Sequence, residues 1–126
     1  TIREGRDVVI FANGVMVSKA LDAAVELEKK GISAKVINVC TVKPLDENAV
    51  KEAVAGYRAV VTAEEHSIIG GLGSAISEAL RGVTDLPIEF VGIHDRFGTS
   101  AHNYDELMEY YGLTSKAIEE AVLKLL

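Results

Sequence analysis

Short apolar runs alternate along this chain with segments whose apolar residues recur at helical spacing. The runs at 7–12 and 59–63 are almost continuously apolar, whereas those at 35–39 and 87–93 carry polar interruptions. Strands that are buried on both faces have such continuous runs. Segments with helical spacing follow at 15–30, 47–55 and about 71–81. This alternation predicts a doubly wound α/β domain with parallel strands.

Several helix boundaries are marked by residues with known capping roles. Gly31 stands where a left-handed C-terminal cap belongs, and Asp46 stands where an N-cap belongs. A capping-box-like pattern predicts a further helix over 103–112. Either Thr114 or Ser115 is expected to cap the last helix.

The order of the strands follows from the same pattern. The two most apolar runs are expected at the centre of the sheet, and each helix is expected to cross right-handed. This predicts the order second, first, third, fourth, with a topological switch point between the first and third strands. Ligands of open parallel sheets bind beyond the carboxyl ends of the strands at such a point. Functional residues are therefore expected after the first and third strands.

Polar residues and glycines gather at the expected carboxyl ends of the strands. They form either a ligand site at the switch point or an interface with another domain or subunit. The candidates are Asn13, Glu64, Glu65, His66, Gly70, Gly71, Gly73, His94 and Asp95.

The glycines that open the third helix have two interpretations. A dinucleotide-binding loop would follow the first strand with G-x-G-x-x-G spacing, and a P-loop would carry a lysine; this sequence has neither. Glu64 and Glu65 would also repel a phosphate. The favoured interpretation is a junction where glycines allow backbone to approach backbone. A carboxylate such as Glu65 would then satisfy the free N–H groups of the helix.

The acid, base and metal interpretations are weaker. Glu65 and His66 are neighbours, so on an extended chain they point to opposite faces. No G-x-S-x-G elbow supplies a nucleophile, and the three histidines lack paired metal-ligand spacing. The sequence therefore predicts no catalytic and no metal residue. A hydrolase that uses His66 or His94 remains an alternative.

Charge and cysteine content limit the possible partners and compartment. The formal net charge is −6, which argues against a nucleic acid or an anionic membrane as partner. No apolar run approaches the roughly 20 residues of a membrane span. Cys40 is the only cysteine, which fits a reducing compartment, and a cytoplasmic location is expected.

Four motifs in order resemble the signature of the transketolase C-terminal domain. They read VKPLD at 42–46, AEEHSIIGGLGSA at 63–75, GIHDRFGTS at 92–100 and YGLT at 111–114. Related domains end deoxyxylulose phosphate synthases and the beta subunits of 2-oxo acid dehydrogenases. The residues around His66 and Arg96 resemble those of transketolase itself more than those of the two related enzymes. One departure is Ala101, where the family usually has glycine.

The resemblance implies a fold and an activity. The fold is a three-layer α/β/α sandwich on a five-stranded, mostly parallel sheet, with one antiparallel edge strand that ends within residues 1–4. The activity is transfer of a two-carbon ketol unit between sugar phosphates by thiamine diphosphate. In such enzymes the preceding domains hold thiamine diphosphate and Mg²⁺. No catalytic or cofactor-binding residue therefore carries over to this chain, which also lacks the G-D-G motif.

The resemblance also implies a role in assembly. Residues 1–126 are expected to be one domain that is inactive alone. The sequence starts at Thr1 without methionine, so this domain is expected to be a fragment of a longer chain. Its expected partners are the cofactor-binding domains or subunit of the same enzyme, with homodimer contacts. The alternatives are a regulatory small-anion-binding module, or the C-terminal domain of one of the two related enzymes.

Overall fold

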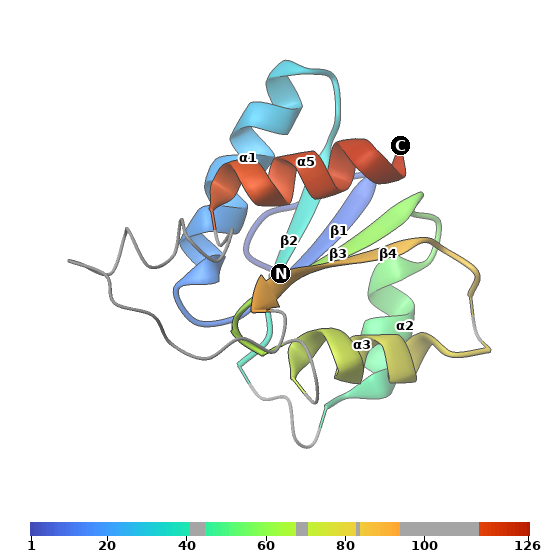
Figure 1. Cartoon of the computed structure of the whole chain (residues 1–126). Helices are drawn as coiled ribbons and strands as arrows, with labels where there is room; N and C mark the ends of the chain where they lie inside the picture. Colours follow the sequence, from blue (N-terminus) through green and yellow to red (C-terminus); the bar gives the residue numbers. More distant parts are fainter. Residues whose placement is uncertain (41–44, 68–70, 83, 94–113) are drawn as a thin grey trace.

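The computed structural model describes residues 1–40, 45–67, 71–82, 84–93 and 114–126. These residues form a three-layer α/β/α sandwich around a parallel four-stranded sheet of order β2-β1-β3-β4, as predicted (Figure 1). The elements are β1 (Val8–Ala12), α1 (Met16–Lys29), β2 (Ala34–Asn38), α2 (Glu47–Val54), β3 (Ala59–Ser67), α3 (Leu72–Leu80), β4 (Ile88–Ile93) and α5 (Ser115–Leu125). The helix expected over 103–112 lies outside the described residues.

Two apolar cores lie on the two faces of the sheet. Alternate residues of β1 divide between them: Val8, Ile10 and Ala12 pack with α1 and α5, whereas Val9 and Phe11 pack with α2 and α3. All five side chains are at most 1% exposed. The continuous apolar run of β1 thus exists because each face of the strand has its own helices to cover it.

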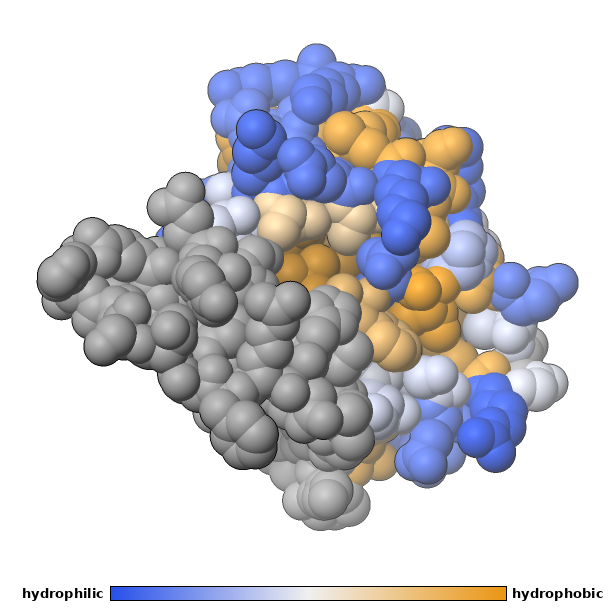
Figure 2. Space-filling model, viewed as in Figure 1, coloured by the Kyte–Doolittle hydropathy of each residue, from blue (hydrophilic) through white to orange (hydrophobic). Residues whose placement is uncertain are grey.

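Charged residues cover the outer surface of α1 and α5. Figure 2 shows these hydrophilic side chains toward the top of the view, with apolar residues between them. Lys30, just after α1, pairs with Glu119 of α5, and Lys124 of α5 pairs with Glu89 of β4 at 3.2 Å. None of the helices in the described ranges is long and apolar enough to cross a membrane.

The antiparallel edge is shorter than the expected fifth strand. Arg3 forms a single antiparallel bridge with Val36 of β2, with Val36 N donating to Arg3 O at 2.9 Å. Beyond this bridge, Asp7 N donates to Ser33 O at 2.8 Å, just before β1 begins. Gly5 passes so close to β2 that a Cβ there would lie 2.2 Å from the backbone carbon of Ala34. Within the described residues, the sheet therefore has four strands and one bridge.

Most of the predicted helix boundaries are confirmed. Asp46 caps α2 by accepting a hydrogen bond from Ala49 N at 3.1 Å, and Thr114, rather than Ser115, caps α5. Gly31 has the left-handed φ of 81° expected after α1. The main difference is β3, which runs on to Ser67 instead of ending at residue 63. A register shift between Ala63 and Ser67 separates this extension from the regular pairing with β4.

Candidate functional site at the sheet switch point

The switch point lies where β1 and β3 pair side by side. Ala12 stands opposite Ala63, and the next residue, Asn13, donates its backbone N–H to Ala63 O at 3.3 Å. Asn13 O accepts a hydrogen bond from Met16 N at 3.2 Å, at the start of α1. Gly14 makes this turn with a φ of 58°. The side chain of Asn13 is half-buried at the carboxyl end of the sheet.

Glu64 supplies the buried carboxylate of the site. It is 1% exposed, and its two oxygens accept hydrogen bonds from the start of α3. The Oε1–Leu72 N distance is 2.9 Å, and the Oε2–Gly73 N distance is 2.7 Å. The first N–H groups of a helix have no partner within the helix, so this carboxylate satisfies two of them. The prediction that a carboxylate of this chain satisfies the free N–H groups of the helix is confirmed.

Glu65 was named above as an example of such a carboxylate, and Glu64 is the one that accepts these two hydrogen bonds. The third strand was expected to end at residue 63, before both glutamates. In the structure β3 continues through both residues. Residues of a strand alternate between faces, so Glu64 shares a face with Thr62 beneath α3. Glu65 follows Glu64 in the strand.

The carboxylate of Glu64 has backbone N–H groups as its hydrogen-bonding partners. Among the described residues, no lysine, arginine or histidine forms an ion pair with it. Burying a charge is costly unless hydrogen bonds compensate. Here two charge-assisted hydrogen bonds and the positive end of the α3 dipole supply the compensation. The negative charge of Glu64 therefore stabilises the start of α3.

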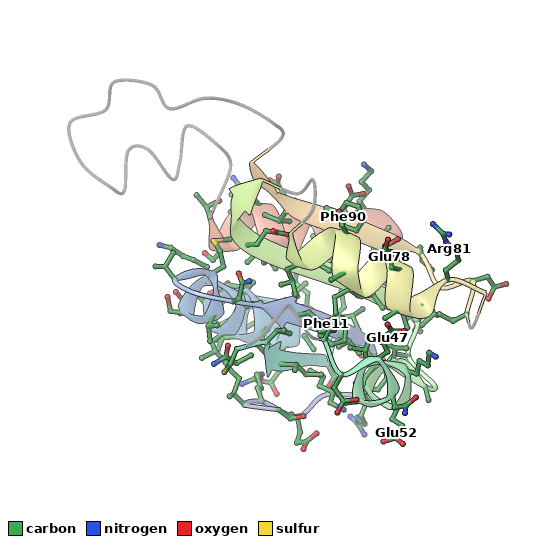
Figure 3. All side chains as sticks on the ribbon, turned by 90° about the horizontal axis from the view of Figure 1, so that it is seen from below. Phe11, Glu47, Glu52, Glu78, Arg81 and Phe90 are labelled. Carbon is green, nitrogen blue, oxygen red and sulfur yellow. The ribbon has the colours of Figure 1, made fainter. Side chains whose placement is uncertain are left out.

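Close packing of α3 on the sheet completes the junction. A Cβ on Gly73 would lie 3.0 Å from Thr62 Oγ1 and 3.1 Å from Phe90 Cδ1. Figure 3 shows Phe90 beside α3, on the face that α3 shares with α2. Thr62 is fully buried, and Oγ1 has no hydrogen-bond partner in the described structure. Thr62 was not among the predicted site residues, although it is the one polar residue in the run at 59–63.

The structure describes only some of the other predicted site residues. Gly71 is the N-cap residue of α3, with an extended backbone conformation. Glu65 and His66 belong to β3, and only their backbone is described. The predictions for Gly70, His94 and Asp95 fall outside the described residues. The structure thus places Glu64, Gly71 and Gly73 together at the start of α3, with Thr62 beside Gly73, and it places the backbone of Asn13 against Ala63.

The described donors do not fit a Mg²⁺–diphosphate group. Magnesium needs free carboxylate or carbonyl oxygens, but both oxygens of Glu64 accept bonds from α3. Within the described ranges, no three histidine, cysteine or acidic side chains are placed to hold a metal ion. That the preceding domains hold the cofactor remains a prediction.

A separate hollow of about 190 Å³ lies between α2 and the sheet. Apolar side chains such as Phe11, Ile37 and Val50 form most of its lining. Its acidic lining residue is Asp46, whose Oδ1 already accepts the N–H of Ala49. This hollow contains none of the predicted site residues, so it does not enlarge the site at the switch point.

The fold and this junction define a doubly wound α/β domain in which a carboxylate of β3 satisfies the start of α3. Residues 1–118 match the family described as the C-terminal domain of transketolase. The chain therefore belongs to the transketolase C-terminal-domain family, as its motifs predicted. The fold predicted from the resemblance is confirmed.

Similar proteins agree with this assignment. The chain is 51% identical to the 6-deoxy-6-sulfo-D-fructose transketolase subunit SqwH of Clostridium sp. (strain MSTE9), over 95% of this chain and 37% of the relative. It is 38% identical to a 1-deoxy-D-xylulose-5-phosphate synthase of Halothermothrix orenii, covering 97% of this chain and 19% of that protein.

A solved structure described as a split gene transketolase, inactive beta4 tetramer, matches with a TM-score of 0.91 and 47% identity. The match covers 98% of this chain and 40% of the solved chain. The chain thus spans less than half the length of each of these three relatives.

Proposed function

We propose that this chain is the assembly-forming C-terminal part of a transketolase and is inactive alone. The parent enzyme transfers a two-carbon ketol unit between sugar phosphates with thiamine diphosphate and Mg²⁺. A preceding part of the same polypeptide, or a separate subunit, holds that cofactor. Family membership and the transketolase subunits among the similar proteins support this proposal.

One observation of the site carries the proposal. Glu64, the buried carboxylate of the switch point, accepts two backbone hydrogen bonds from α3 and so serves the structure of the domain. An acid or base catalyst needs a carboxylate that reaches a substrate proton. With both oxygens engaged and 1% exposure, Glu64 does not meet this need. The carboxyl edge with Asn13, Glu65 and His66 then serves as an interface.

The activity is tested by comparing the isolated 126 residues with the same chain combined with the cofactor-binding part of its enzyme. Both samples receive thiamine diphosphate, Mg²⁺, a ketose phosphate donor and an aldose phosphate acceptor. We expect ketol transfer from the combined sample and none from the isolated chain. Turnover by the isolated chain would contradict the proposal.

The interface is tested with Asn13→Lys, which places a charge at the switch point where the side chain is half-buried. We expect weaker association with the cofactor-binding part, measured by sedimentation. Glu120→Lys on the exposed surface of α5 is the matched control and should associate normally. Equal association of both variants with the cofactor-binding part would show that the interface does not lie at the switch point.

A further inference from the structure

The start of α3 has the donors of an oxyanion site. Leu72 N and Gly73 N both point at one small group, the Glu64 carboxylate, at 2.9 and 2.7 Å. The positive end of a helix dipole favours a negative charge there. In many α/β proteins a ligand anion binds such a helix start. Here a side chain from β3, eight residues before Leu72, fills the position.

A second observation is a buried donor without a partner beside the helix start. Thr62 Oγ1 is fully buried, lies 3.0 Å from where a Cβ of Gly73 would stand, and has no hydrogen-bond partner in the described structure. A hydroxyl is a donor that an oxyanion with three or four oxygens can engage. Glycine at 73 keeps this hydroxyl next to the helix start, because a methyl group would crowd both.

We propose that the start of α3 is an oxyanion site that this chain fills permanently with Glu64. In the native chain the start of α3 is therefore closed to phosphate groups. Removing the Glu64 side chain opens the site to small carboxylates and to inorganic phosphate. This inference does not rest on the proposed function, since it concerns the chain by itself.

The first experiment follows the amide signals of Leu72 and Gly73 in the native chain during titration with phosphate. Sodium chloride of matched ionic strength is the control for screening. We expect no saturable shift of either amide. A saturable shift specific to phosphate would overturn the proposal directly, and this experiment needs no variant.

The second experiment measures rescue of Glu64→Ala by formate, acetate and phosphate. We expect each anion to raise its thermal midpoint in a saturable way, because a ligand at ten times its Kd raises the folding constant about 11-fold. The matched control is Glu78→Ala, which removes an exposed glutamate from the same helix. An equal rise in the two variants, or none in Glu64→Ala, would contradict an oxyanion site.

Two further variants sharpen the result. Glu64→Gln keeps the shape of the side chain and still fills the space, so we expect no saturable rescue. Adding Thr62→Val to Glu64→Ala removes the third donor, and we expect a weaker affinity for phosphate. Rescue of Glu64→Gln equal to that of Glu64→Ala would show a general salt effect. An unchanged phosphate affinity without the hydroxyl would remove Thr62 from the site.

Discussion

Helices α2 and α3 both begin at a carboxylate, but the two carboxylates come from different places. Asp46 immediately precedes α2, is exposed, and accepts a bond from Ala49 N three residues later. Glu64 belongs to a strand, is buried, and reaches two N–H groups of a helix that starts eight residues later. The first cap is local and holds one helix. The second joins a helix to the sheet, so its loss should disturb the tertiary structure.

Glu64→Ala tests this difference most strongly. Two buried N–H groups lose a charged acceptor, and each such hydrogen bond contributes about 1.5–3 kcal/mol. We expect the free energy of unfolding to fall by about 3–6 kcal/mol, measured by urea denaturation. Glu78→Ala, on the same helix but exposed, should change it by less than about 0.5 kcal/mol. Similar losses in both variants would show that the two hydrogen bonds of Glu64 contribute no more to stability than an exposed glutamate does.

Gly73→Ala tests the close approach of α3 to the sheet. The added methyl would meet Thr62 and Phe90 at 3.0–3.1 Å, and overpacking typically costs about 1–3 kcal/mol. Better helix propensity of alanine offsets at most about 1 kcal/mol of this. We expect a net loss of about 2 kcal/mol in the free energy of unfolding.

Gly82 provides the matched control for this substitution. Apart from Gly82 itself and its chain neighbours, no atom of the described residues lies within 4 Å of its Cβ position, but its φ of 72° strains any other residue. Gly82→Ala should therefore lose about 1 kcal/mol through the backbone alone. If Gly73→Ala were as stable as the native chain, the contact would be too loose to position α3.

Asp46→Ala should have a smaller effect, because this cap is exposed and local. Removing an N-cap carboxylate typically costs about 1 kcal/mol. Asp46→Asn, which keeps an oxygen for Ala49 N, should recover most of the loss in thermal unfolding. A loss as large as that of Glu64→Ala would erase the distinction between the local and the buried cap.

Thr62→Val should have the smallest effect and the opposite sign. The hydroxyl of Thr62 is buried without a described partner, so it carries a desolvation cost that valine avoids. Valine keeps the branched shape that suits a strand. We expect the free energy of unfolding to stay equal or rise by up to about 1 kcal/mol. A clear destabilisation would mean that the hydroxyl has a partner in solution.

The same comparison explains what could be predicted from the sequence. The cap of α2 was predicted because Asp46 and the helix it caps are adjacent in the chain, as are Gly31 and α1. The order of the sheet followed from the continuous apolar runs and the right-handed crossings. Family motifs added the antiparallel edge, which the structure shortens to the bridge at Arg3.

For the start of α3, Glu65 was named as an example of a closing carboxylate, whereas Glu64 is the residue that accepts the two hydrogen bonds. Which glutamate faces the helix depends on where β3 ends, and strand ends are poorly marked in a polar stretch. The closeness of Thr62 to Gly73 is a contact between sheet and helix, and no local pattern encodes it. Sequence reasoning thus identified the kind of group that closes the helix, but only the path of β3 identified Glu64.

The bridge between Arg3 and Val36 also bears on the solubility of the domain. The outer side of an edge strand carries unpaired N–H and C=O groups, which can template a strand of another molecule and start aggregation. Residues 2–3 occupy this side of β2 at its middle, and Arg3 adds a charge paired with Glu28 at 3.1 Å. Tyr57 holds the same segment in place by donating to Gly5 O at 2.6 Å. A few residues thus protect β2 against edge-to-edge association.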